Sequence, residues 1–140
     1  MGEIHAQLLN DCKILGRFKL CHLLLMLDAN YPWFILVPDR VSIREIYQLN
    51  DDDQMQLLAE SSLLSDRIMQ AFNGDKLNVA ALGNQVPQLH VHHIVRYRGD
   101  PAWPAPVWGK VAAKTYSETE LDDLLSKLDL SQLPEFTVSI

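Results

Sequence analysis

The spacing of hydrophobic and polar positions changes several times along the chain, and each change predicts a different element. Dense apolar runs bounded by turn-forming residues indicate buried strands, and the turn-forming residues 28–32 between the first two runs indicate a hairpin. The strands expected in this way lie at residues 17–26, 33–37, 77–82 and 89–97, the last two joined by a turn at Gly83 and Asn84. A short helix is expected at residues 4–10.

Two further segments carry the signature of longer helices. Asn50 and the three aspartates after it place a capping side chain and negative charge where a helix begins. The apolar positions that then recur at helical spacing are Leu57, Leu64, Ile68 and Phe72, and Gly74 is expected to end this helix. Ser117 and Glu120 match a capping box ahead of an apolar face made by Leu121, Leu124, Leu125 and Leu128.

The order of these elements favours an α+β fold, because the strands gather in the centre of the chain and the helices are separate from them. The 140 residues are about the length of one domain and can bury a hydrophobic core. No stretch rich in Pro, Gly or Ser divides the chain, and no internal repeat is present. We therefore expect one domain spanning residues 1–140.

Composition and charge argue against several classes of protein. The 12 Lys and Arg residues against 18 Asp and Glu give a net charge of -6, so no positive field attracts a nucleic-acid polymer. The longest apolar stretch, residues 20–27, is too short to span a membrane, and the N-terminus lacks the basic segment and apolar run of a secretion signal. Cys12 and Cys21 form no disulfide or zinc pattern, so we expect a cytoplasmic protein.

Three of the five histidines fall within one expected strand, in the sequence Gln88-Leu-His90-Val-His92-His93-Ile. Side chains alternate along a strand, so Gln88, His90 and His92 are expected on one face. His93 is expected on the other face, towards a covering helix. Neighbours on the shared face would lie about 7 Å apart. Such a density of imidazoles indicates a chemical role.

Three interpretations of this face compete. His90 and His92 could bind a metal ion, although no nearby Cys and no HExxH spacing supplies further ligands. The segment could also be a structural strand that is merely polar. The interpretation we favour is phosphate chemistry, because imidazole can attack phosphorus as a neutral nucleophile and can contact phosphoryl oxygens as a cation.

These residues resemble the signature of the histidine triad (HIT) superfamily of nucleotide hydrolases and transferases, His-φ-His-φ-His-φ-φ with φ apolar. Gln88 stands at the first triad position. The resemblance covers roughly residues 15–108. It includes the expected strand that ends at Val37 and Pro38 and the segment Gly83-Asn-Gln-Val86 just before the triad. It implies a HIT-like fold, a central antiparallel sheet with flanking helices, and a C-terminal helical extension at about residues 109–140.

The resemblance also implies a reaction. His90 matches the family's nucleophile, which attacks the α-phosphorus of a nucleotide and becomes nucleotidylated. His92 matches the residue that orients the phosphate or stabilises its charge, and water or another acceptor then releases the nucleoside monophosphate. Gln88 can form hydrogen bonds but has no proton to give near neutral pH, so phosphoanhydrides are expected to be better substrates than phosphoramidates. This chemistry requires no metal and no cofactor.

Five polar residues match positions that approach the nucleotide in the family, namely Asp28, Asn30, Asn78, Asn84 and Gln85. Asp28 and Asn30 match the position on the ribose hydroxyls, and the other three match the polar segment that leads to the phosphate. All of them could instead be ordinary turn residues. Trp33 stands where many relatives have a histidine.

The partners implied by the resemblance are a small-molecule nucleotide and a second copy of the chain, because many relatives pair through such a sheet or its long helix. Neither a nucleic-acid polymer nor a membrane is expected as a partner. Two alternatives stay open. A non-catalytic nucleotide-binding module could keep the pocket without a general acid, and a metal-binding protein could use His90, His92 and His93.

Overall fold

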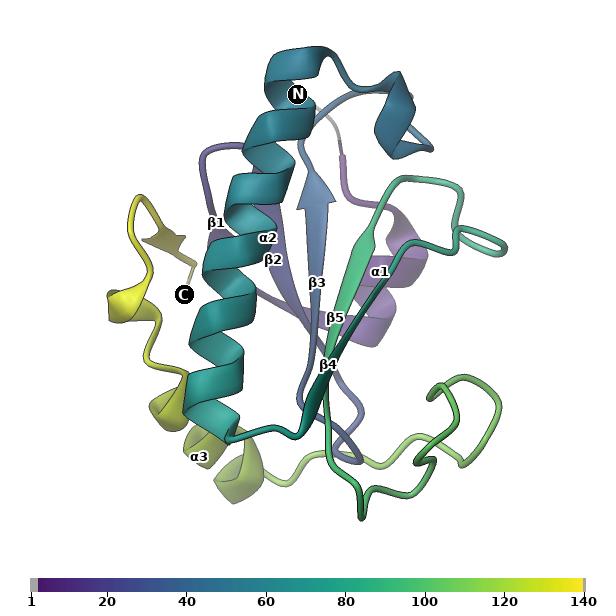
Figure 1. Cartoon of the computed structure of the whole chain (residues 1–140), viewed down its shortest axis with the longest axis vertical. Coiled ribbons are helices and arrows are strands. Elements are labelled where there is room, and N and C mark those ends of the chain that lie inside the picture. The colour runs from purple at the N-terminus through teal and green to yellow at the C-terminus, as the bar shows by residue number, and fades with distance from the viewer. Residues whose placement is uncertain (1–2, 140) are drawn as a thin grey trace.

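A computed structural model of the chain describes residues 3–139. Met1, Gly2 and Ile140 lie outside the described residues, and so does the start of the N-terminal stretch that was considered for a secretion signal. The strands form one six-stranded antiparallel sheet in the order β4-β5-β3-β2-β1-β6 (Figure 1). They are β1 (Cys12–Arg17), β2 (Cys21–Met26), β3 (Trp33–Pro38), β4 (Lys76–Ala80), β5 (Val91–Arg96) and β6 (Thr137–Val138). The helices are α1 (Ala6–Asp11), α2 (Asp51–Phe72) and α3 (Glu118–Leu128), with short 3₁₀ turns at Ile46–Gln48 and Leu130–Gln132. The predicted α+β fold with a central antiparallel sheet and flanking helices is confirmed.

Apolar side chains are buried on both faces of the sheet. The helix α2 runs along one face, as Figure 1 shows, and α3 packs beside it. The core on this face includes Leu23, Phe34, Leu64, Ile68 and Val95. The opposite face is covered by α1 and by the loop after β5, and its core includes Leu8, Leu24, Ile35, Ile94 and Val107. The second face is the one that carries the candidate site.

The prediction of one strand at residues 17–26 is wrong at its beginning. Arg17 is the last residue of β1, a strand that the sequence pattern did not indicate, and β2 begins only at Cys21. A turn at residues 18–20 separates the two strands. The hairpin expected after it is present, because β2 pairs antiparallel with β3.

A helix carboxylate holds the turn between β1 and β2. Glu60 of α2 is 1% exposed, and its two oxygens accept the main-chain N–H groups of Leu20 and Cys21, each at 2.8 Å. The side-chain amide of Gln56 donates to the same carboxylate at 2.6 Å. Burying a carboxylate is costly unless its oxygens are hydrogen-bonded, and these donors meet that need. Burial and the neighbouring Glu60 charge raise the pKa of the Cys21 thiol.

The two long helices begin where their capping residues predict. Asn50 accepts the N–H of Asp53, and Ser117 and Glu120 form both hydrogen bonds of a capping box. The prediction that Gly74 ends α2 is wrong by one residue, because Asn73 takes the left-handed conformation with φ 50°. Gly74 is needed for space, since a Cβ atom there would lie 2.4 Å from a methyl group of Val95.

The stretch after residue 109 contains α3 and also β6, a strand that the sequence pattern did not indicate. The strand β6 pairs with β1 at the edge of the sheet, with Gly16 opposite Val138. Gly16 has φ 154°, and a Cβ atom on it would lie 2.2 Å from the carbonyl oxygen of Thr137. A larger residue at position 16 would therefore displace β6 from the sheet.

Replacing Glu60 with Gln tests whether its carboxylate stabilises the turn between β1 and β2. The amide keeps one acceptor oxygen but turns an NH₂ group towards a main-chain N–H, so the variant leaves a buried donor unpaired. We expect a loss of about 1–3 kcal/mol in the free energy of unfolding, measured by denaturant titration. The matched control is Asp66→Asn, the same change on an exposed position of α2, which should stay within about 0.5 kcal/mol of the parent. Equal losses in both variants would contradict the role of Glu60.

Candidate functional site

The imidazoles of His90 and His92 come together at the start of β5. This strand begins at Val91, later than the expected Leu89, so His90 precedes it and His92 lies within it. The two ring centroids are 4.9 Å apart and the rings are inclined by 71°. Both side chains are largely buried, at 7% and 5% exposure. The two rings therefore lie together on one face of the sheet, as the sequence predicts, although His90 stands just before the strand.

The hydrogen bond at Nδ1 fixes the tautomer of His90. This nitrogen lies 2.7 Å from the main-chain carbonyl oxygen of Gln88. A carbonyl can only accept, so Nδ1 carries the proton and Nε2 of the neutral ring keeps its lone pair. Within residues 3–139, Nε2 has no hydrogen-bond partner, and it is not among the buried polar atoms that lack one. It therefore keeps contact with solvent and is available as a nucleophile.

His92 is held in the opposite tautomer by Trp33. The indole N–H donates to Nδ1 of His92 at 2.9 Å. An indole nitrogen can only donate, so Nδ1 carries no proton and the neutral ring carries its proton on Nε2. Burial, and to a lesser extent positive charge on His90 and His93, lowers the pKa of His92 to about 3. His92 is thus a neutral ring that presents an N–H donor.

Aromatic side chains enclose His92. The ring of Trp108 lies edge-on at 5.1 Å from His92 and 5.6 Å from Trp33, measured between centroids. Trp33, at the position where the family resemblance leads one to expect a histidine, donates its indole N–H to the residue that matches the third triad position. Sequence reasoning assigned no role to Trp33 or Trp108, and only their nearness to the triad in the fold reveals one.

His93 points to the other face of the sheet, towards a covering helix, as predicted. Its Nε2 lies 2.7 Å from the hydroxyl of Ser61 on α2, and its Nδ1 lies 3.0 Å from the carbonyl oxygen of Val91. The carbonyl requires a proton on Nδ1, so Nε2 accepts from the hydroxyl. Burial lowers the pKa of His93 to about 4, although the bond to Val91 opposes the shift. His93 is a satisfied core residue.

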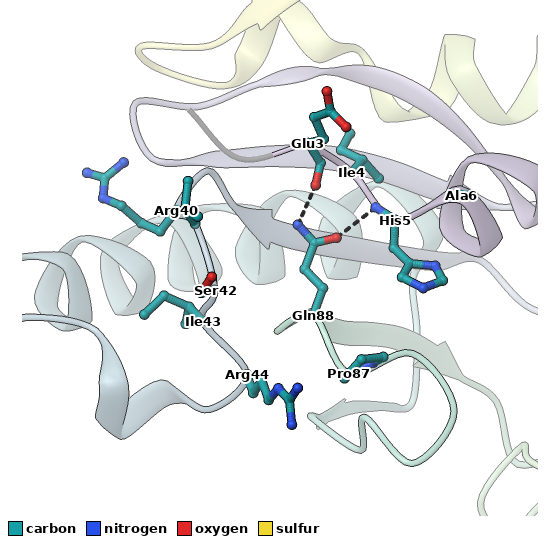
Figure 2. Close-up of a pocket in the computed structure, with 11 residues that line it drawn as sticks. Glu3, Ile4, His5, Ala6, Arg40, Ser42, Ile43, Arg44, Pro87 and Gln88 are labelled. Carbon is teal, nitrogen blue, oxygen red and sulfur yellow. Dashed lines mark hydrogen bonds between the residues drawn. The ribbon is translucent and has the colours of Figure 1, made fainter.

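The side chain of Gln88 is tied to the N-terminal segment. Its Nε2 donates to the carbonyl oxygen of Glu3 at 2.8 Å, and its Oε1 accepts the N–H of His5 at 2.7 Å (Figure 2). The expectation that Gln88 lies in a strand with the two imidazoles is wrong, because Gln88 precedes β5. Its carboxamide instead binds the N-terminal segment, more than 80 positions away in the sequence, and its main-chain carbonyl orients the His90 ring.

The structure places Asp28 and Asn30 against the C-terminal part of the chain. Oδ1 of Asp28 accepts from the main-chain and side-chain N–H groups of Asn30 and from the N–H of Lys114. Asn30 also donates to the carbonyl oxygen of Ala112. Both side chains therefore fasten the segment that leads to α3, and these contacts do not join them to the imidazoles.

Asn78 is also engaged within the protein. Its Oδ1 accepts from the guanidinium of Arg96 at 2.8 Å. By contrast, Asn84 and Gln85 lie exposed in the loop between β4 and β5, where their side chains have no hydrogen-bond partner within residues 3–139. Of the polar residues expected near the phosphate, these two are therefore the ones free to bind a ligand.

A narrow crevice reaches His90 from this loop. It has a volume of about 10 Å³, which is room for about one water molecule, and its walls include Gly83, Gln88 and Arg44. Gly83 has φ 74°, a conformation that glycine adopts without steric cost. The crevice by itself is too small to enclose a nucleotide.

Within residues 3–139, no three His, Cys, Asp or Glu side chains lie together in a way that could hold a metal ion. Over the same residues, no helix has the length and apolar character needed to cross a bilayer.

Comparison with known proteins gives consistent matches. The family model described as HIT domain matches residues 7–99. A histidine triad protein from Marinobacter aquaeolei VT8, solved by crystallography, is 54% identical, with 95% of this chain and 98% of that chain covered and a TM-score of 0.90. Two further crystal structures are also similar. The histidine triad protein from Bradyrhizobium japonicum is 43% identical, with 94% of this chain and 97% of that chain covered and a TM-score of 0.90. The histidine triad protein from Sinorhizobium meliloti 1021 is 40% identical, with 90% of this chain and 93% of that chain covered and a TM-score of 0.87. No curated protein matches the chain.

The neutral states of His92 and His93 predict a pH dependence of stability. Their folded-state pKa values lie below the ordinary value of 6.5, so the unfolded chain binds more protons at acidic pH. The stability that the neutral rings contribute is present above about pH 6.5 and is lost as the pH falls, down to about 4 for His93 and about 3 for His92. At pH 5, compared with neutral pH, we expect each of these two histidines to lower the free energy of unfolding by roughly 2 kcal/mol. Denaturant titration at the two pH values measures the loss.

The Trp33→Phe variant isolates the contribution of His92. Without the indole donor, Nδ1 of His92 can hold a proton, so the pKa of His92 should rise while that of His93 stays low. Proton and nitrogen NMR of the imidazoles measures both, and it also reports the two tautomers. A parent protein in which His92 titrates near 6.5 would contradict the assignment.

Proposed function

Because this chain belongs to the HIT domain family, we propose that it is a nucleotide phosphate hydrolase or nucleotidyl transferase that forms a covalent intermediate at His90. Proteins of the family bind nucleotides and typically act on the α-phosphate. The observation that carries the proposal is the pair of opposite tautomers, with a lone pair on Nε2 of His90 and an N–H on Nε2 of His92. One ring can attack phosphorus while the other donates to its oxygens.

The proposed first step is attack of His90 on the α-phosphorus. The N–P bond forms while the P–O bond to the leaving group breaks, and the leaving oxygen takes the electron pair. His92 donates its N–H to a non-bridging phosphoryl oxygen, where negative charge develops. Water then adds to phosphorus, the N–P bond breaks, and the nucleoside monophosphate leaves as the proton of the water passes to solvent. Another acceptor in place of water gives transfer.

Pre-orientation of the two rings supports this mechanism. The carbonyl of Gln88 and the indole of Trp33 each hold one imidazole by its Nδ1, so neither ring has to reorient during the reaction. The binding of the nucleotide itself falls to Asn84 and Gln85, whose side chains are free. Contact of Asp28, Asn30 or Asn78 with the ligand requires them to give up hydrogen bonds within the protein.

The proposal includes a homodimer and a cytoplasmic location. β4 lies at one edge of the sheet, and its Val79 is 51% exposed. Met55 and Leu58 of α2 are 70% and 69% exposed. These side chains line an apolar cavity of about 460 Å³ between α2 and the sheet. An exposed strand edge next to an apolar patch suits pairing with a second copy of the chain. The two free, buried cysteines agree with a reducing compartment.

Replacing His90 with Ala tests the covalent mechanism. With diadenosine triphosphate as substrate, the parent protein should release AMP and ADP, and mass spectrometry after rapid quenching should find an adenylyl group on His90. The variant should lose turnover to the detection limit, because no other group replaces the attacking nitrogen. Adenosine 5′-phosphoramidate should react more slowly with the parent, because Gln88 cannot protonate the leaving nitrogen.

Binding measured beside turnover separates the enzyme from a non-catalytic module. Calorimetry with AMP should show binding to both the parent and the His90→Ala variant. Binding without any turnover or adduct in the parent would favour the module, for which the engaged carboxamide of Gln88 is the supporting observation. A purified protein that retains a stoichiometric metal ion would instead favour the metal-binding alternative.

The proposed dimer is tested by Leu58→Asp. A carboxylate in the apolar patch should shift the protein from a dimer to a monomer in sedimentation equilibrium, because a charge cannot be buried there without a partner. The matched control is Leu9→Asp, at a 47% exposed position of α1 on the other face of the sheet, which should leave the mass unchanged. A parent protein that sediments as a monomer would contradict the proposal.

A further inference from the structure

A wide pocket adjoins the crevice that reaches His90. It has a volume of about 630 Å³ and lies between the loop after β3 and the N-terminal segment (Figure 2). Arg44 and Gln88 line both the pocket and the crevice, so the two spaces meet at these residues. A group bonded to phosphorus at His90 and leaving on the side of Gln88 would therefore enter this pocket.

Gln88 itself builds one wall of the pocket. By holding Glu3 and His5, its carboxamide fixes the N-terminal segment beside Pro87. The Nδ1 of His5 accepts the N–H of Gln7, so the neutral His5 ring carries its proton on Nε2 and can donate to a ligand. In Figure 2 the Glu3 carboxylate points away from Gln88. On this wall, His5 therefore offers its Nε2–H to a ligand.

The opposite wall carries two arginines in different states. Arg40 is committed, because its guanidinium donates twice to Asp53 at 2.6 Å and 3.0 Å and once to the carbonyl oxygen of Asp39. Within residues 3–139, the guanidinium of Arg44 has no hydrogen bond and no ion pair. Ser42, two positions before it, is held at φ 58°, a conformation unusual for a residue with a side chain. Arg44 is therefore an uncommitted cation at the junction of pocket and crevice.

We propose that this pocket is the leaving-group subsite and that Arg44 selects leaving groups that carry their own negative charge, such as a phosphate chain. The inference rests on the proposed function, because it requires attack by His90. The positive charge of Arg44 would compensate for the lack of a general acid at Gln88. A carboxamide cannot protonate the leaving oxygen, so that oxygen departs as an anion, and the fixed positive charge of Arg44 stabilises it instead.

The test compares two substrates that share the AMP half. Diadenosine triphosphate releases ADP, a multiply charged leaving group, whereas the p-nitrophenyl ester of AMP releases a phenolate that needs neither protonation nor a phosphate site. Arg44→Ala should lower kcat/KM for the first substrate by about 10- to 100-fold and for the second by less than about 3-fold. Arg44→Lys should recover part of the loss, because it restores the charge without the planar donor geometry.

The control is Arg98→Ala, which removes the same charge from an exposed position in the loop after β5 and should change neither substrate. Equal losses on both substrates, or no loss on diadenosine triphosphate, would overturn the inference while leaving the proposed function intact.

If the parent turns over neither substrate, the proposed function fails, and calorimetry with inorganic tripolyphosphate decides the subsite. Binding that is lost in Arg44→Ala but kept in Arg98→Ala would support it, and binding that survives in both, or no binding to the parent, would overturn it.

Discussion

The paired charges of Arg96 and Asp100 constrain the path of the chain after β5. Arg96 is 1% exposed, and its guanidinium donates to Asp100, to Asn78 and to the carbonyl oxygen of Ala105. Burial alone would raise the pKa of Asp100, but the bonds from Arg96 and from the N–H groups of Tyr97, Trp103 and Ala102 lower it overall. Losing either partner would leave a buried charge unpaired, which is strongly unfavourable. The loop after β5 therefore has one stable path across the sheet.

That path determines the surroundings of His92. The loop lays Val107 on the second face of the sheet and sets the edge of Trp108 against the ring of His92. The apolar cover lowers the local dielectric, which favours a neutral imidazole, and the indole of Trp33 selects the nitrogen that keeps the proton. A charged pair that touches neither imidazole thus helps to keep the site neutral. The proposed chemistry depends on this arrangement, because a ring protonated on both nitrogens could no longer accept the N–H of Trp33.

The structural features that the sequence predicted depend on residues a few positions apart in the chain. The features that it missed depend on contacts between residues far apart in the chain. The starts of α2 and α3 follow from capping residues three positions apart, and the separation of His92 from His93 follows from strand alternation. The start of β2 depends on Glu60, which lies 40 positions from Leu20, and the side chain of Gln88 binds a segment 85 positions away. No local pattern carries that information. No local pattern indicates the aromatic rings around His92 either, because Trp33 comes from the neighbouring strand β3 and Trp108 from the loop after β5.

The positions of the three tryptophans also give the protein a built-in optical probe. Trp33 and Trp108 contact His92, and Trp103 lies over the guanidinium of Arg96 with its ring centroid 5.6 Å from that group. All indole emission of the chain therefore originates in this one corner of the molecule. A change in its wavelength or intensity on adding a nucleotide reports events beside the imidazoles directly, without an attached dye or a coupled enzyme assay.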